Sequence, residues 1–168
     1  VVNYTLFGGA SGFMLATAYS AYASPELVNF YAGWTAIITA AVLVTRVASL
    51  IRNARIKPKS TIQTAIGVRH ANVQQKSQGF LGGSFNTREF FHRAPRWVFR
   101  SVKWVFLVLV FPIPLLLLWA GVSLHGVGLA TGAATLVAAF VIQYLGLMAE
   151  RWFFFAQPNH PQILYYQP

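Results

Sequence analysis

The chain has 168 residues with a net charge of +10, a hydrophobic content of 56% and a charged content of only 10%. Soluble domains carry about 25% charged residues, so this composition excludes an ordinary soluble globular domain. There is no cysteine, which excludes a disulfide framework, a Cys-ligated iron–sulfur cluster and a structural Cys zinc site within this chain.

Four apolar stretches cover most of the sequence, at residues 3–23, 27–51, 104–124 and 126–155. Each has roughly the 20 residues needed to cross the ~30 Å hydrocarbon core of a bilayer. Short turns near residues 24–26 and 123–126 join them in two pairs, which we expect to be antiparallel hairpins. The predicted fold is therefore all-α: a single polytopic transmembrane helix bundle, residues 1–168, with four spans.

Two local features inside these stretches affect how the helices pack. Pro112 and Pro114 lie in the third stretch, where we expect a kinked helix, because membrane helices tolerate a kink when neighbours satisfy the freed carbonyls. An early helix end is the alternative. Two glycine pairs have GxxxG spacing, which lets helices approach closely: Gly8 with Gly12, and Gly128 with Gly132.

The positive charge is concentrated in one loop between the second and third stretches. Eleven of the 13 Lys and Arg residues lie in residues 52–103, and the two short turns on the other side have none. The positive-inside rule then places this basic loop and both ends of the chain in the cytoplasm. Membrane lipids are the expected surroundings, and nucleic acid is not an expected partner.

The basic loop is too long for a simple helix connection. Its residues Ser60-Thr61-Ile62-Gln63 have the spacing of a capping box, which predicts a short amphipathic helix lying on the membrane or on a partner subunit. We expect the loop to dock a soluble partner. The predicted docking residues are Arg52, Arg55, Lys57, Lys59, Arg69, Arg93 and Arg96.

Glu89 is the only acid in the basic loop. Its spacing from Asn86 is that of a capping box, and an ion pair with a nearby Arg is a second structural role. The functional alternative is a carboxylate that exchanges protons with a lipid-soluble redox carrier. His70 and His92 are either solvated or hydrogen-bonded to a quinone carbonyl. None of the four histidines is deep within a span, so a bis-His haem is not expected.

Few charges lie within the apolar stretches. Glu150 and Arg151 are about one turn from the end of the fourth stretch, and Arg46 is about one turn from the end of the second. An ionisable pair at bilayer depth is functional by default. Snorkelling of the side chains toward the interface, or pairing with each other, explains Glu150 and Arg151 equally well, and both interpretations stay open.

Residues 82–92, Gly-Gly-Ser-Phe-Asn-Thr-Arg-Glu-Phe-Phe-His, resemble a motif of the membrane-anchor subunits of dimethyl-sulfoxide-reductase-type molybdoenzymes. Residues 61–67 fit this pattern too. Residues 149–156, running on to His160 and Tyr165-Tyr166, are similar to the last helix and tail of those anchors. The resemblance covers roughly residues 45–168 and is nearest to the anchor of cytoplasm-facing sulfite dehydrogenase, a sulfite:quinone oxidoreductase. The spans match the second half of such an anchor.

The resemblance implies a non-catalytic or quinone-reactive subunit, which docks an iron–sulfur subunit and a molybdopterin catalytic subunit. Electrons would pass between the iron–sulfur subunit and ubiquinone or menaquinone at the subunit interface. It also implies that this chain alone binds no haem, iron–sulfur cluster or metal. In this family a Ser-x-Glu-like position of the first half is associated with quinol binding, and Arg88-Glu89 looks like its counterpart in the second half. The candidates for quinone binding or proton transfer are Glu89, Arg88, His92, His70, Asn86, Glu150 and Arg151.

Two other functions remain open from the sequence. The chain could be a passive membrane scaffold of a multisubunit complex, with the chemistry elsewhere. It could also be half of a small transporter. The near absence of ionisable residues that could line a path through the spans is evidence against a transporter.

Overall fold

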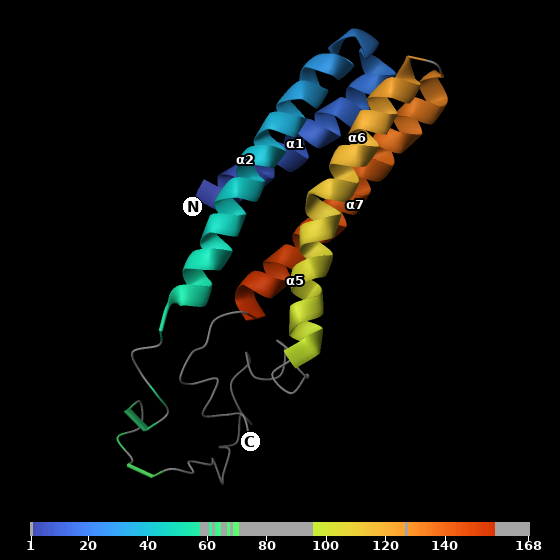
Figure 1. Cartoon of the computed structure of the whole chain (residues 1–168). Helices are drawn as coiled ribbons and strands as arrows, with labels where there is room; N and C mark the ends of the chain where they lie inside the picture. Colours follow the sequence, from blue (N-terminus) through green and yellow to red (C-terminus); the bar gives the residue numbers. More distant parts are fainter. Residues whose placement is uncertain are drawn as a thin grey trace, which may run out of the picture.

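The computed structural model describes residues 2–57, 61, 63, 64, 67, 69, 70, 96–126 and 128–156 (Figure 1). The secondary structure of these residues is helical, without a strand, as the all-α prediction requires. The elements in chain order are α1 (Val2–Ala23), the 3-10 turn η1 (Pro25–Leu27), α2 (Val28–Arg55), α5 (Arg96–Val110), α6 (Pro112–His125) and α7 (Leu129–Ala156).

Within the described residues, three helical segments are long and apolar enough to cross a membrane: Pro25–Arg55, Arg100–His125 and Leu129–Phe155. They correspond to the second, third and fourth predicted spans. Helix α1 has 22 residues, which is a length of about 33 Å at 1.5 Å per residue, but it is not among the three segments. The first predicted span is therefore not confirmed.

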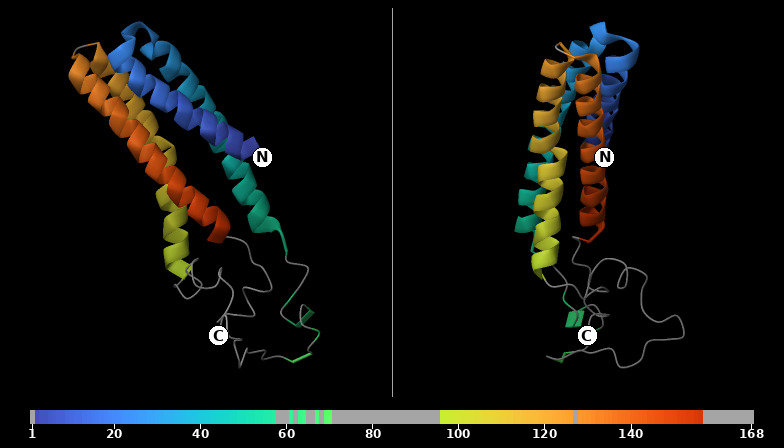
Figure 2. Two further views of the ribbon diagram at one scale, coloured as in Figure 1. Left: turned by 180° about the vertical axis from the view of Figure 1, so that it is seen from behind. Right: turned by 90° about the vertical axis from the view of Figure 1, so that its right-hand side faces the viewer.

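The helices form two hairpins that pack side by side (Figures 1 and 2). Helices α1 and α2 make one hairpin, α6 and α7 make the other, and α1 and α5 both also pack against α7. The chain leaves α1 through a turn in which the Leu27 N–H donates to the Ser24 carbonyl at 2.9 Å. Helices α2 and α7 are the second helices of their hairpins, so both run from the end with the short turns toward the end where the basic loop joins.

The helices extend beyond the predicted spans on both sides of the basic loop. Helix α2 continues to Arg55, and α5 begins at Arg96, whereas the apolar pattern predicts a span ending at residue 51 and a loop covering 52–103. A membrane helix does not have to end where its apolar stretch ends, because its next turns reach the polar headgroup region and stay hydrogen-bonded there. The first charges after an apolar stretch therefore do not mark the end of its helix.

The prolines produce a kink, as predicted, and not an early end. Helix α5 stops at Val110, Phe111 separates it from α6, and the pair continues as one membrane-length segment (Figure 2). Prolines 112 and 114 lack the N–H that would continue the helical ladder, and the first bond after the break is from Leu115 N–H to the Phe111 carbonyl at 3.1 Å.

The glycines at close helix contacts are mostly not those of the predicted GxxxG pairs. A Cβ on Gly146 would lie 2.9 Å from the Leu109 carbonyl carbon, and one on Gly121 would lie 2.8 Å from the Leu136 side chain. A Cβ on Gly132 would meet the His125 backbone at 2.5 Å, whereas Gly8 and Gly12 have nothing within 4 Å. The prediction is therefore wrong for the first pair, since a glycine spacing does not tell which face of a helix is packed.

The buried apolar residues form three clusters along the bundle. The first fills the end with the short turns and includes Met14, Leu118 and Leu136. The second lies in the middle and contains Phe7, Ala10, Val42, Val110 and Phe111. The third, at the other end, contains Leu50, Phe106 and Phe153.

Candidate functional site

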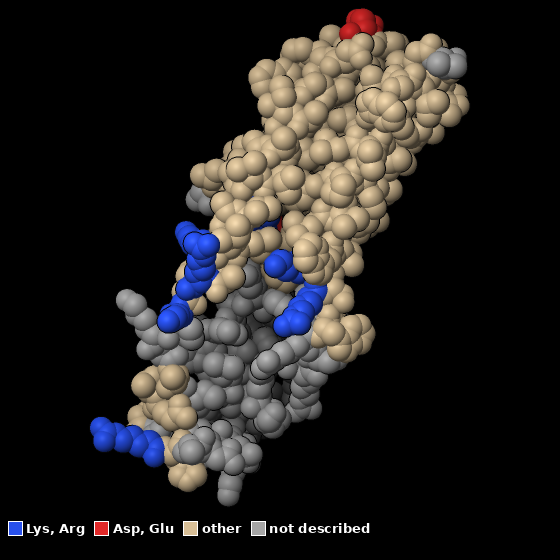
Figure 3. Space-filling view, in the orientation of Figure 1, with Lys and Arg blue, Asp and Glu red and all other residues tan. Residues whose placement is uncertain are grey.

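Lys and Arg side chains gather around one end of the helix bundle, and most of the remaining helical surface in the same view carries no charge (Figure 3). Arg52, Arg55 and Arg100 are exposed at this basic end, and Lys103 is half-buried. Glu26 is exposed in η1 at the opposite end. The described helix ends therefore carry the asymmetry in charge that the sequence predicts.

A cluster of three charged side chains is enclosed just inside the basic end. The distance between Arg46 Nη2 of α2 and Glu150 Oε1 of α7 is 2.6 Å, so the two side chains form an ion pair. The geometry of these two atoms is not that of a hydrogen bond. The neighbouring Arg151 donates from Nε to Glu150 Oε2 at 2.6 Å, and its Nη2 also pairs with that oxygen. The side chain of Glu150 is 0% exposed, that of Arg46 is 3% and that of Arg151 is 28%.

Aromatic rings surround this ion cluster. The Arg46 guanidinium carbon lies 5.6 Å from the centre of the Phe106 ring. The Arg151 guanidinium carbon is 3.8 Å from the centre of the Tyr4 ring, and Phe7 and Phe154 are 5.5 and 5.6 Å from it. A cation over an aromatic face is attracted by the ring quadrupole, most strongly where water is excluded. The rings therefore stabilise the positive charge that the single carboxylate does not neutralise.

Helix α1 joins the same level of the bundle through a polar contact. Asn3 Nδ2 donates to Ser49 Oγ at 3.0 Å, and Ser49 Oγ donates to the Thr45 carbonyl at 2.8 Å. Residues 45 and 49 flank Arg46 on α2. This contact anchors the first turn of α1, which carries Tyr4, beside the ion cluster.

The cluster has a net charge of +1, from two guanidiniums and one carboxylate, and some of its donors are unused. Arg46 Nε and Arg151 Nη1 have no hydrogen-bond partner within the described part of the chain. Burial makes an unpaired donor costly. Arg151 is the most exposed member, at 28%, but its unused Nη1 is itself buried, so an electron-rich oxygen would have to enter the bundle to accept a hydrogen bond from it.

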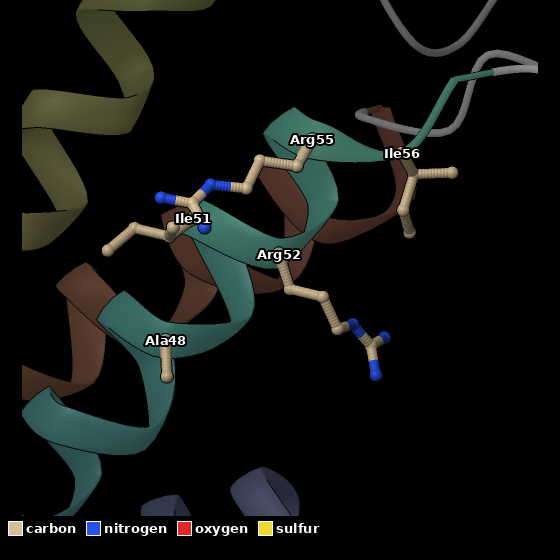
Figure 4. Close-up of a pocket in the computed structure, with 5 residues that line it drawn as sticks. All are labelled: Ala48, Ile51, Arg52, Arg55 and Ile56. Carbon is tan, nitrogen blue, oxygen red and sulfur yellow. The ribbon is translucent and has the colours of Figure 1, made fainter.

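A second feature of the basic end is a hollow of about 540 Å³ on α2, lined by Ala48, Ile51, Arg52, Arg55 and Ile56. Figure 4 shows the Arg55 side chain lying back toward Ile51, while Arg52 extends to the other side of the helix. The hollow is apolar at its base with two guanidiniums at its rim. Two predicted docking residues thus lie beside an open surface.

The structure brings together only some of the predicted site residues. Glu150 and Arg151 are joined, and their partner is Arg46, which stands out in the sequence only by its position. Arg69 and His70 are exposed, and the His70 carbonyl accepts a hydrogen bond from Gln63 Nε2 at 3.5 Å. Arg96 begins α5. Glu89, Arg88, His92, Asn86, Lys59 and Arg93 lie outside the described residues.

The predicted capping box is described only in part. Thr64 N–H donates to Thr61 Oγ1 at 3.3 Å, and Thr61 N–H donates to Thr64 Oγ1 at 2.7 Å. This reciprocal pair is one residue further along than the predicted one, and Gln63 and Thr64 are helical. The rest of the predicted amphipathic helix lies mostly outside the described residues.

No group of three or more His, Cys, Asp or Glu side chains that could hold a metal ion occurs among the residues with described positions. Taken with the fold, the protein is an apolar helix bundle of membrane-spanning length that has a buried ion cluster near its basic end. The ion cluster has the acceptors and donors of a hydrogen-bonding site, and not the ligands of a metal centre.

Comparison with known proteins gives one informative relative. The C subunit of the sulfite dehydrogenase of Allochromatium vinosum is 54% identical to the chain over 168 residues, which are 99% of this chain and 50% of that protein. The chain therefore spans about half the length of the curated relative it matches. No family model matches the chain, and no solved structure matches it significantly.

Proposed function

We propose that this chain is part of the membrane subunit of a sulfite-oxidising complex, in which it passes electrons from an iron–sulfur partner to membrane quinone. The observation that carries the proposal is the 54% identity to a sulfite dehydrogenase subunit along the whole chain. Helices long and apolar enough to span a membrane support the membrane location. The resemblance to molybdoenzyme anchors adds the expected molybdopterin and iron–sulfur partners.

The two half-reactions balance without further reactants. Oxidation of sulfite to sulfate takes an oxygen atom from water and releases an electron pair and two protons. Reduction of a quinone to a quinol takes up an electron pair and two protons. Redox centres carry the electrons in such reactions, and the protein supplies binding, orientation and electrostatics. The chain has no cysteine for an iron–sulfur cluster, so we assign the clusters to the partner subunit.

We place the quinone end of this transfer at the ion cluster. The Arg151 side chain is partly exposed, and its unused Nη1 donor is buried beside the ion cluster, where a quinone carbonyl that enters the bundle can reach it. Glu150 fixes the direction of the Arg151 guanidinium, and Arg46 holds Glu150 from the opposite helix. The net positive charge favours the oxygen that gains electron density during reduction. Mostly apolar walls with a few polar groups are typical of sites for such ligands.

The basic end then faces the partner subunits on the cytoplasmic side of a bacterial inner membrane. Arg52, Arg55, Lys57 and Arg69 are exposed and, with Arg96 at the start of α5, are the described members of the proposed docking surface. Helix α1 completes a bundle of four spans in this proposal. Glu89 and His92 of the basic loop remain candidates for proton transfer to the quinone.

The direct test uses the purified complex with sulfite as donor and a short-chain ubiquinone as acceptor. Arg151→Gln should lower quinone reduction by at least about tenfold, since a hydrogen bond from a charged group is lost. Sulfite oxidation with ferricyanide should be unchanged, because that acceptor takes electrons before the membrane site. Arg100→Gln, an exposed change at the same end, should leave both activities intact.

The passive-scaffold alternative makes the opposite forecast for the same variants. It expects Arg151→Gln to keep full quinone reduction whenever the complex assembles, with assembly followed by co-purification of the partner subunits. Iron and molybdenum in the purified complex would support the iron–sulfur and molybdopterin partner subunits. A complex without these metals would rule out both partners.

A further inference from the structure

Two polar side chains in the middle of the bundle have no hydrogen-bond partner among the described residues. Gln143 of α7 is 1% exposed, and both its amide oxygen and its amide nitrogen are unpartnered. Thr39 of α2 is 1% exposed, and its hydroxyl is unpartnered as well. Thr17 and Thr35 differ, since each donates to a carbonyl one turn earlier at 2.8 Å. Buried polar groups are nearly always hydrogen-bonded, so Gln143 and Thr39 require an explanation.

The register of the helices puts these two side chains at one level. Thr39 precedes Arg46 by seven residues, and Gln143 precedes Glu150 by seven residues. Seven residues are about two turns, which is a rise of about 10.5 Å with a return to the same helix face. Helices α2 and α7 run in the same direction (Figure 2), and Arg46 meets Glu150 between them. By this register Thr39 and Gln143 lie at about the same level of the bundle, two turns from the ion cluster, and we refer to them as the second polar layer.

The proline kink lies at this level too. Gly121 of α6 packs against Leu136, and Gly146 packs against Val110 at the end of α5. Since α6 and α7 are antiparallel, these two contacts place Gln143 opposite Pro114, which is buried. Proline has no N–H, so Pro112 and Pro114 cannot donate to the carbonyls four residues earlier, those of Val108 and Val110. The kink thus leaves two backbone acceptors of α5 without their usual donors, within about one turn of the level of Gln143.

We propose that the polar layer of Thr39, Gln143 and the kink is a binding site for water. A water molecule needs two to four polar partners, and the layer offers an amide, a hydroxyl and carbonyl oxygens. Water also satisfies freed carbonyls at proline breaks in membrane helices. A metal cation is disfavoured, because the nearest ionised groups, Arg46, Arg151 and Glu150, sum to a net charge of +1. The site does not depend on the function proposed for the ion cluster.

The water site is separate from the ion cluster. The apolar side chains of Phe7, Val42, Val110 and Phe111 fill the bundle between the two layers. The water is therefore internal to the bundle and is not an extension of the aqueous phase at the basic end. It explains how a glutamine is accommodated in the interior of a membrane-length helix.

A methionine at the same level can report on this water. Thr17 Oγ1 lies 3.2 Å from Thr35 Oγ1, and α1 is antiparallel to α2, so Met14 comes opposite the turn that holds Thr39. Met14 is 0% exposed, whereas Met148 is 57% exposed, and the chain has two methionines. Hydroxyl radicals convert methionine to the sulfoxide, and X-ray radiolysis makes these radicals from water, including water bound inside a protein.

The experiment exposes the full chain in lipid nanodiscs to X-ray pulses and measures the oxidation rate of each methionine by mass spectrometry. The wild type should oxidise Met14 despite its burial. The double change Thr39→Val and Gln143→Leu should lower the Met14 rate several-fold relative to Met148. Thr39→Val alone, which is nearly isosteric, should lower it by less. Thr35→Val, a buried change of a hydroxyl that already has a partner, should leave it unchanged.

Two outcomes would overturn the water site. One is a wild-type protein in which Met148 is oxidised and Met14 is not. This outcome is measured on the wild type, so it does not depend on the folding of any variant. The other is a Met14 rate that is the same in the wild type and in the double variant. Circular dichroism and size exclusion in the same nanodiscs show that the compared proteins are folded.

Discussion

The two polar layers between α2 and α7 occupy equivalent positions two turns apart, yet they are stabilised differently. In the outer layer, Arg46 and Glu150 are paired with each other by protein contacts. In the inner layer, Thr39 and Gln143 have no protein partner among the described residues. A buried charge demands a protein counter-charge with fixed geometry, whereas a neutral amide or hydroxyl can be satisfied by water. The difference predicts that mutations have unequal effects in the two layers.

The largest effect is expected where a charge loses its partner. Glu150→Gln should lower the free energy of unfolding by about 3–5 kcal/mol, because it leaves Arg46 charged and buried. Thermal unfolding in nanodiscs measures the change. The double variant Arg46→Gln with Glu150→Gln removes both charges and should recover much of the loss. If the double variant is no more stable than Glu150→Gln, the loss of stability does not come from leaving Arg46 without its ion-pair partner.

The next effect concerns the close packing between the layers. Gly146 lies one turn from both Gln143 and Glu150, and a Cβ there would lie 2.8 Å from Val110 Cγ2. Gly146→Ala should therefore destabilise the chain by about 1–3 kcal/mol through overpacking. The matched control is Gly12→Ala, whose Cβ would have open space and which should stabilise the helix by about 0.5–1 kcal/mol. Equal effects of the two substitutions would contradict the helix packing described for α5 and α7.

A smaller effect is expected in the inner layer. Gln143→Leu removes an amide but leaves no charge behind, so its effect on the free energy of unfolding should stay within about 1 kcal/mol. The same unfolding assay applies, with Glu150→Gln as the reference. A loss as large as that of Glu150→Gln would abolish the distinction between the two layers.

The smallest effect is expected at the exposed basic surface. Arg100 is exposed on α5, and surface substitutions usually change stability by no more than about 0.5 kcal/mol. Arg100→Gln should therefore leave the unfolding temperature nearly unchanged. A large loss would mean that the basic end takes part in the core of the bundle.

The sequence alone predicted the all-α class and the kink at Pro112, and it identified Glu150 and Arg151 as candidate site residues. Long apolar runs and charges within them are conspicuous in a single sequence. The pairing of Arg46 with Glu150 was not predictable, because it depends on the register between α2 and α7, which are far apart in the chain. Helix ends were missed for a different reason: the helical hydrogen bonds continue past the apolar stretch to Arg55.

Polar residues without charge were missed as well. Gln143 and Thr39 are ordinary residues in composition, and only the absence of partners in the described structure distinguishes them. A possible signal was the identical spacing of seven residues to Arg46 and to Glu150. That spacing becomes meaningful only after the two charges are known to meet.

Sulfite-dependent quinone reduction by the complex carrying Arg46→Gln with Glu150→Gln tests the role of the ion cluster most directly. This pair of changes removes the Arg46–Glu150 contact and leaves Arg151, the most exposed of the three, as the remaining charge, so the complex should still assemble and still reduce ferricyanide. Quinone reduction should fall by at least about tenfold, because Arg151 loses the carboxylate that orients it. Quinone reduction at the wild-type rate in the assembled double variant would contradict a quinone site at the ion cluster.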